Sequence, residues 1–200
     1  MEIKKASKVS ANENAIYLIS SEKDLPKKGF SKEEAAYIKK EIKAEQAIIE
    51  INRISRIDYI VCLGKDKDYK AFEKARVEGA NMTGILNKAR IKSVVIVSEM
   101  DATISFLEGI ALSNYQFLKY FSDKKVNSLK TVKVITSHKK AEIDEIQNTV
   151  NGTNYAKDLV NEPQSFLTAT QISKEIKKLG KEAGFKVEVF NKAKIKSLKM

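Results

Sequence analysis

The chain of 200 residues contains very little cysteine, histidine, proline or glycine. Its single cysteine, Cys62, excludes an intramolecular disulfide and any metal site built from several thiolates. Its single histidine, His138, excludes any site that needs two histidines. With 2 prolines and 8 glycines, low-complexity linkers, collagen-like segments and a turn-rich all-β sandwich are disfavoured. No apolar run approaches the roughly 20 residues of a membrane-spanning helix. The charged start Met1–Lys5 lacks the apolar stretch of a secretory signal. These absences predict a cytoplasmic globular protein.

The charge of the chain is strongly positive. Lysine and arginine number 37 against 26 acidic residues, for a formal net charge of +11. Such a surplus occurs in nucleic-acid-binding proteins. However, arginine, the residue that reads phosphates and guanines bidentately, occurs only at Arg53, Arg56, Arg76 and Arg90. The basic stretch 151–200 also lacks the interleaved aromatic residues that stack on single strands. We therefore expect a solvated lysine surface, with nucleic-acid binding as an alternative.

Short β-branched segments alternate with helical patterns along residues 15–160, which is typical of an α/β domain. Strands are predicted at Ala15–Ser20, Ala47–Ile51, Tyr59–Leu63, Val94–Val97 and Val132–Ile135. Helices are predicted after the capping box Ser31–Glu34 and over Asp68–Ala89, Thr103–Tyr120 and Ala141–Leu159. Ala75 and Gly79, small residues within the second helix, are expected to let it approach the sheet closely. The fold class expected is α/β, a three-layer mixed sheet flanked by helices.

The pattern changes after the last of these helices. Pro163 ends that helix, and Thr168 caps an amphipathic one that carries Ile172, Ile176 and Leu179. Gly184 is expected to close this helix in the left-handed conformation, before a strand at Phe185–Phe190 and a helix at Asn191–Leu198. A helix and a strand without partners make an incomplete second α/β unit, so the sequence looks cut.

For each side chain that could be catalytic, we prefer a structural role to a catalytic or binding one. Gly64-Lys65 lacks the other glycines of a phosphate-binding loop and is interpreted as a strand-to-helix turn. Cys62 lies in an apolar strand and is expected to be a small buried hydrophobe. His138, at a strand-to-helix junction, is expected to be a solvated loop residue.

The acidic residues give no metal cage either. Glu142, Asp144 and Glu145 fall in the first turn of a helix, where acids favour the helix dipole. Asp66 and Asp68 are interpreted as loop and helix-start residues. Asp158 and Glu162 are too few for a carboxylate metal site.

Two longer motifs carry a resemblance to a known family. Glu108–Tyr120 reads E-G-x-x-L-x-x-Y-x-F-x-x-Y, and Asn154–Thr168 contains A-K-D-L-V-N-E-P before a helix and a G-x-x-V-x-V segment at Gly184–Val189. Both resemble the leucine aminopeptidases, the cytosolic two-metal aminopeptidases. Ser165 and Ala169 depart from the usual asparagine and proline, in connecting structure. The looser agreement covers most of residues 14–200.

The resemblance implies a domain plan. It predicts a macro-domain-like N-terminal aminopeptidase domain over 1–150, an interdomain helix and connector over 151–167, and the beginning of a truncated catalytic domain over 168–200. Tyr115, Phe117 and Tyr120 are expected to anchor a helix rather than touch substrate. Asn161 and Pro163 are expected to fix the exit of the interdomain helix, where the asparagine can satisfy helix-end carbonyls.

The resemblance also implies a function for the longer parent. That enzyme removes N-terminal amino acids from peptides with two divalent metals, zinc with manganese or magnesium, and assembles as a hexamer. The family's metal ligands lie downstream of this sequence, so no catalytic, metal-binding or substrate-binding residue is assigned here. The fragment is expected to be inactive, to hold no cofactor, and to serve assembly and active-site access.

Alternative functions are a stand-alone macro-like module that binds ADP-ribose or a related nucleotide, and nucleic-acid binding. The scattered glycines argue against the first of these. The segment with Val187 and Val189 is also expected to pair between molecules and give artefactual dimers.

Overall fold

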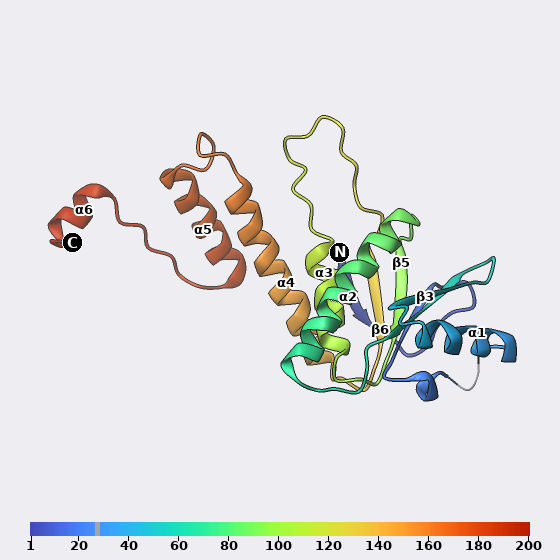
Figure 1. Cartoon of the computed structure of the whole chain (residues 1–200). Helices are drawn as coiled ribbons and strands as arrows, with labels where there is room; N and C mark the ends of the chain where they lie inside the picture. Colours follow the sequence, from blue (N-terminus) through green and yellow to red (C-terminus); the bar gives the residue numbers. More distant parts are fainter. Residues whose placement is uncertain (27–28) are drawn as a thin grey trace. The chain divides into compact units, whose positions relative to one another are not determined.

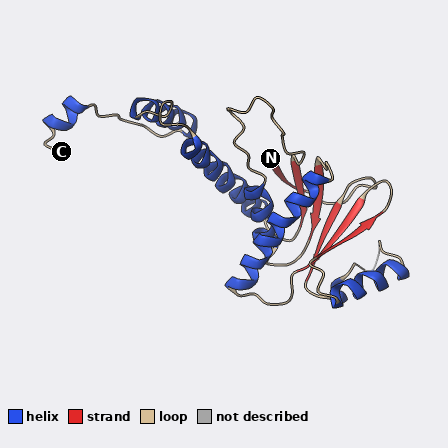
Figure 2. Cartoon of the chain, turned by 45° about the horizontal axis from the view of Figure 1, so that its top comes forward, coloured by secondary structure: helices blue, strands red, loops and turns tan. Residues whose placement is uncertain are grey.

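A mixed six-stranded sheet is the centre of the first part of the molecule, as the computed structural model describes it for residues 1–26 and 29–200 (Figures 1 and 2). The strand order is β1-β6-β5-β2-β4-β3. Only β3 runs antiparallel to its neighbour among these described strands. The strands are β1 (Glu2–Lys5), β2 (Ala15–Ile19), β3 (Ile48–Asn52), β4 (Ile57–Cys62), β5 (Ser93–Val97) and β6 (Thr131–Ile135).

Helices cover the sheet on both faces and confirm the predicted α/β class with three layers (Figure 2). On one face α2, α3 and the first part of α4 share a core with the sheet. On the other face α1 packs against β2, β3 and β4. The helices are η1 (Glu22–Asp24), α1 (Lys32–Lys43), α2 (Tyr69–Lys88), α3 (Thr103–Ser113), α4 (Lys140–Asn161), α5 (Ala169–Ala183) and α6 (Lys192–Ser197).

The alternation of side chains along β4 explains why this strand is apolar throughout. Tyr59 and Val61 point into the core beneath α2 and α3, and Ile60 points into the smaller core beneath α1. Successive residues of a strand face opposite sides, so a strand covered on both sides must be apolar at every position. The exception is Asp58, which is completely buried.

Two glycines allow α2 and α3 to pack backbone against backbone. A Cβ added to Gly79 would collide with the carbonyl oxygen of Phe106, and one added to Gly109 would collide with that of Arg76. Gly79 therefore meets α3. This corrects the expectation that this position serves the approach of α2 to the sheet.

The predicted helix caps are confirmed. The Ser31 hydroxyl accepts from the Glu34 amide at 3.1 Å, and the Glu34 carboxylate accepts from the Ser31 amide at 2.7 Å. Thr168 caps α5, and Gly184 ends it with a left-handed φ of 80°. A side-chain cap offsets otherwise unpaired amides and stabilises a helix by about 1 kcal/mol.

Three elements differ from the sequence predictions. β1 was not predicted, because four residues with a single buried side chain give almost no periodicity. The helix predicted to reach Tyr120 ends at Ser113. There the Asn114 amide group donates to the Leu129 carbonyl at 3.0 Å and fixes the chain in a loop that returns to β6. Residues 185–190 form no strand, since no other strand of the described residues pairs with them.

The chain divides into two compact units, Met1–Asn154 and Tyr155–Met200, and α4 contributes residues to both. In the second unit, Gly180 of α5 is buried because Phe185 and Val187 lie directly over it. The apolar side chains of Ile172 and Ile176, on the same helix, are exposed. The predicted division into 1–150, 151–167 and 168–200 stays a prediction.

Across residues 1–26 and 29–200, no helix has the length and apolar composition needed to cross a membrane.

Candidate functional site

The parallel strands end together at one edge of the sheet, and the order of strands reverses there. From β2 the chain continues to β3 and β4 on one side, whereas β5 lies on the other side of β2 and leads on to β6. The connections from β2 and β5 therefore diverge and leave a crevice outside their carboxyl ends. In open α/β sheets, such a point is where ligands bind.

A cavity of about 350 Å³ lies at this point. Its apolar lining includes Tyr17 and Ile19 from β2, Val97 from β5, and Met100 from the loop that follows. Two acidic residues, Asp24 and Glu99, are also part of its lining.

A second cavity, of about 340 Å³, shares Ser20, Glu99 and Met100 with the first. It extends to the turn after β4, where Gly64 has a positive φ of 84°. Lys65 also belongs to its lining, so this cavity brings a cation close to the acids of its neighbour.

Both acids of the first cavity are held by hydrogen bonds. The hydroxyls of Ser20 and Ser21 donate to one Asp24 oxygen and lower the pKa of that carboxyl. Hydrogen bonds from Ser137 lower the pKa of Glu99, whose carboxylate accepts the Ser137 amide at 2.9 Å. Hydrogen bonds to the charged form favour ionisation, so both groups are carboxylates at neutral pH.

His138 lies beyond this crevice, at the end of β6, and is not the solvated residue expected. Its side chain is only 18% exposed. Nδ1 lies 3.1 Å from a Glu142 carboxylate oxygen, and Nε2 lies 3.4 Å from the Met100 carbonyl oxygen. The same carboxyl group accepts the Lys139 amide, which is the largest cause of the lowered pKa of Glu142.

Cys62 is half-buried, on the side of β4 that faces α1. Its Sγ lies 3.8 Å from the carbonyl oxygen of Ser20. Cys62 is therefore less buried than predicted, although it packs against the apolar core beneath α1.

The other acidic candidates are separated in the structure. Asp68 caps α2 by accepting the Ala71 amide at 2.8 Å, and Asp66 belongs to the lining of the second cavity. Asp144 pairs with Lys140 within α4 at 2.5 Å, and Glu145 is exposed. No group of three or more His, Cys, Asp or Glu side chains that could hold a metal ion occurs in the described part of the chain. Asp158 and Glu162 lie in α4 and just after it.

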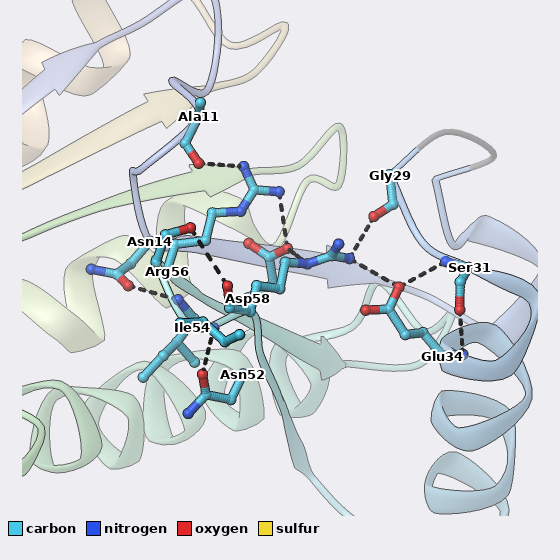
Figure 3. A network of polar contacts seen from close by, with 12 residues as sticks. Ala11, Asn14, Gly29, Ser31, Glu34, Asn52, Ile54, Arg56 and Asp58 are labelled. Atoms are coloured by element: carbon cyan, nitrogen blue, oxygen red, sulfur yellow. Dashed lines mark hydrogen bonds and ion pairs between the residues drawn. The ribbon is translucent and has the colours of Figure 1, made fainter.

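A buried ionic network that the sequence analysis did not identify lies at the opposite edge of the sheet (Figure 3). One Asp58 oxygen lies 2.6 Å from Arg53 Nε and 3.1 Å from Arg56 Nη2. Arg53 also pairs with Glu34 of the α1 cap and donates to the Gly29 carbonyl. The sequence contains a signal for this network, because an aspartate inside an otherwise apolar strand, two residues after an arginine, indicates a buried ion pair.

The first family motif contributes to the contact between α2 and α3. Glu108 lies 2.8 Å from Arg76 Nε, and hydrogen bonding to Glu108 is the largest cause of the raised pKa of Arg76. Gly109 packs on the backbone of the same arginine. Tyr115, Phe117 and Tyr120 lie in the loop after α3, which corrects the prediction that they span a helix.

In the second motif, α4 ends at Asn161, as predicted. The Pro163 carbonyl then accepts two amides, those of Phe166 and Leu167, both at 2.9 Å. The role predicted for Asn161, satisfying helix-end carbonyls, stays a prediction.

Curated proteins provide close relatives, although no family model matches the chain. A probable cytosol aminopeptidase of Clostridium perfringens is 35% identical over 145 residues, which are 68% of this chain and 29% of the relative. A second one, of Aquifex aeolicus, is 29% identical over 149 residues, which are 71% of this chain and 30% of the relative. The chain thus spans about 30% of the length of these relatives.

Solved structures support the same fold. A mutant of tomato leucine aminopeptidase superimposes with a TM-score of 0.74 at 14% identity, over 100% of this chain and 46% of that protein. The bottromycin maturation enzyme BotP, solved in complex with Mn, gives a TM-score of 0.68 at 17% identity, over 94% of this chain and 40% of BotP. Identities this low show the fold alone. Together with the sequence relatives, they show that the chain belongs to the cytosol (leucine) aminopeptidase family and fits an N-terminal region of its members.

Proposed function

We propose that this chain is the N-terminal, non-catalytic part of a metallo-aminopeptidase that removes N-terminal amino acids from peptides. The observation that carries the proposal is the match to the Clostridium perfringens relative, which takes up 68% of this chain but 29% of that protein. The matched region is a minor part of an enzyme whose remaining length has room for a separate catalytic domain.

The metal chemistry of such an enzyme belongs outside the residues described. BotP is a structural neighbour that was solved in complex with Mn, and two divalent metals are expected in the parent enzyme. A metal pair of this kind activates a bridging water and polarises the scissile carbonyl. The described residues do not fit that group, because they hold no cluster of three or more ligating side chains. We assign no step of the reaction to them.

The role proposed for this part is assembly and control of access to the active site. Exposed apolar side chains in the second unit support it, among them Ile172, Ile176 and Phe185. Contiguous exposed apolar surface is typical of sites that contact other protein. Further copies of the chain, in a hexamer, and peptide substrates of the parent are the proposed partners, in the cytoplasm.

A hydrolysis assay tests the non-catalytic assignment. The purified chain is incubated with leucine p-nitroanilide and Mn²⁺ or Zn²⁺, beside the Clostridium perfringens relative as a positive control. We expect release of nitroaniline by the relative alone. Hydrolysis by this chain that a chelator abolishes would contradict the assignment.

A segment exchange tests the assembly role. In one variant of the Clostridium perfringens relative, the matched 145 residues are replaced by their counterpart from this chain; in another they are deleted. We expect the exchange to keep the oligomer seen by light scattering and the deletion to lose it or to change KM. A deletion variant with unchanged mass and kinetics would refute the role.

A stand-alone macro-like module for ADP-ribose or a related nucleotide is the second candidate, favoured by the crevice at the carboxyl ends of β2 and β5. Calorimetry with ADP-ribose tests it, and an absence of binding heat excludes it. For nucleic acid, the +11 charge predicts an affinity that falls steeply with salt. Binding that is insensitive to salt would exclude a lysine-driven interaction.

A further inference from the structure

We infer that the crevice between β2 and β5 binds an α-amino acid with an apolar side chain. Its two adjoining cavities present an apolar surface, two carboxylates and a lysine around shared walls. An apolar α-amino acid has a side chain for the apolar surface, an ammonium group for the carboxylates and a carboxylate group for the lysine. The inference concerns the chain itself and does not depend on the aminopeptidase proposal.

The apolar part of the ligand fits the first cavity. Tyr17, Ile19, Val97 and Met100 contribute to its lining, and its volume is about 350 Å³. Binding sites for small ligands start at roughly 300 Å³, so the cavity is limited to a small molecule. A branched side chain such as that of leucine would lie against these residues.

The ammonium group fits the carboxylates of Asp24 and Glu99. Each carboxylate has one oxygen held by the fold, Asp24 by Ser21 at 3.0 Å and Glu99 by Ser137 at 2.9 Å. The Ser20 hydroxyl also donates to Asp24, and both the amide and the side chain of Ser137 contribute to Glu99. An ionised carboxylate has about four lone-pair sites, so each group can still accept N–H groups from a ligand, and the bonds already made keep each side chain in position.

The carboxylate group of the ligand fits Lys65 of the second cavity. Neighbouring Lys67 is already paired with Asp101 at 2.7 Å, whereas Lys65 forms no ion pair with another described residue. Lys65 is close enough to Asp24 to act on its ionisation. A cation and two carboxylates in adjoining cavities suit a zwitterion.

The same charges disfavour a nucleotide. The lining of the second cavity carries more acids than cations, and the pair between Lys67 and Asp101 leaves Asp66 and Glu99 against Lys65, an excess of negative charge that would repel a pyrophosphate. A phosphate site instead relies on unopposed cations and backbone amides. The charge distribution thus separates an amino acid from ADP-ribose as the ligand of this crevice.

Amide NMR titration of the full chain tests the inference with L-leucine as the probe. We expect saturable shifts at residues around Val97 and Gly64. Leucinamide, 4-methylpentanoate and glycine each lack one of the three groups and should bind more weakly than leucine. The inference is overturned if leucine gives no saturable shift, if leucinamide binds as tightly as leucine, or if ADP-ribose alone shifts these residues.

Two substitutions test the polar contacts. Glu99→Gln keeps an acceptor for the Ser137 amide but removes the charge, and Lys65→Gln removes the cation. Exposed ion pairs contribute about 0.2–1 kcal/mol, so each change should weaken leucine binding up to about fivefold. Lys88→Gln, at the other end of α2, and Glu188→Gln, in the second unit, are the matched controls.

Equal affinity in all four variants would overturn the assignment. Because binding is measured on this chain without an enzyme assay, failure of this inference and failure of the aminopeptidase proposal give different results.

Discussion

Asp58 shows how much a single buried charge determines in this fold. Its side chain has no exposed surface, and two arginines from the turn between β3 and β4 neutralise it. Through Arg53 the same network reaches Glu34, which caps α1. The ion pairs thus join the β3–β4 hairpin to the start of α1, where the apolar core is small.

The substitution Asp58→Asn should strongly destabilise the protein. It keeps the shape of the side chain, leaves Arg56 without its counter-charge and leaves Arg53 with Glu34 alone. Removal of one member of a buried pair typically costs about 3–5 kcal/mol. Because both arginines are partly exposed, we expect the lower end, about 3 kcal/mol, from urea unfolding followed by circular dichroism.

The matched control for this experiment is Asp101→Asn. Asp101 pairs with Lys67 at 2.7 Å, and both side chains are more than half exposed. This change should cost less than about 1 kcal/mol. Equal losses in the two variants would show that burial of the Asp58 network does not matter for stability.

At the scale of elements, the contact between α2 and α3 depends on the absence of side chains. Gly79 and Gly109 each lie against a carbonyl of the opposite helix. The ion pair of Arg76 with Glu108 lies beside this contact. Glu108 and Gly109, the first two residues of the family motif Glu108–Tyr120, are therefore explained by packing within the domain, and no contact with a substrate is needed to explain them.

Gly79→Ala should disrupt this packing. The added methyl group meets backbone atoms of Phe106 and Ile110, which cannot move without shifting α3. Overpacking of a core typically costs about 1–3 kcal/mol, and we expect at least the upper value in thermal or urea unfolding.

Gly84 offers a control on the same helix. A Cβ there meets no atom within 4 Å, so Gly84→Ala should stabilise the protein by about 0.5–1 kcal/mol through helix propensity. If both alanine variants are stabilised, the close approach of α2 and α3 does not constrain Gly79.

The sequence predictions were correct where a feature depends on local pattern and wrong where it depends on contacts between distant residues. β4 was predicted well because it is a short, almost continuously apolar run, and α2 because its buried residues recur every three to four positions. The Ser31–Glu34 cap was predicted because it is purely local. The segment 114–120 has helical spacing but ends in a loop, because Asn114 bonds to Leu129, 15 residues away. Tertiary contacts of this kind have no local signature.

The crevice was not predicted for a related reason. Its lining comes from the ends of β2, β4 and β5, and no single segment contains a motif. Only the strand order brings Ser20 beside Glu99 and Gly64. Cys62 lies in β4 as its strand pattern predicts, but it is only partly buried.

At the scale of the whole chain, the two units differ in how they are stabilised. Met1–Asn154 contains the sheet and both apolar cores. Tyr155–Met200 contains helices whose apolar side chains are partly exposed, such as Ile176 and Leu198. We therefore expect the first unit to supply nearly all of the cooperative unfolding transition.

Truncation after Asn161, where α4 ends, tests this expectation. The shortened chain should keep its circular dichroism at 222 nm per helical residue and its Tm within about 2 °C, because little of the apolar core is lost. A truncation after Ile135 serves as the control and should unfold, since it removes Ile143 and Val150 from the core. A large loss of Tm in the first truncation would show that residues beyond α4 stabilise the sheet.

The pairing of β1 with β6 has a consequence for the order in which the chain can fold during synthesis. Ile3 lies opposite Val132, so among the described strands β1 pairs with the one that is latest along the chain. On the ribosome, β2 and β4 can pair early, whereas Glu2–Lys5 must wait until about 130 further residues have emerged. Long-range pairing is slow to form. β1 is therefore the last of the described strands to join the sheet, and until β6 has emerged it stays accessible to chaperones and modifying enzymes.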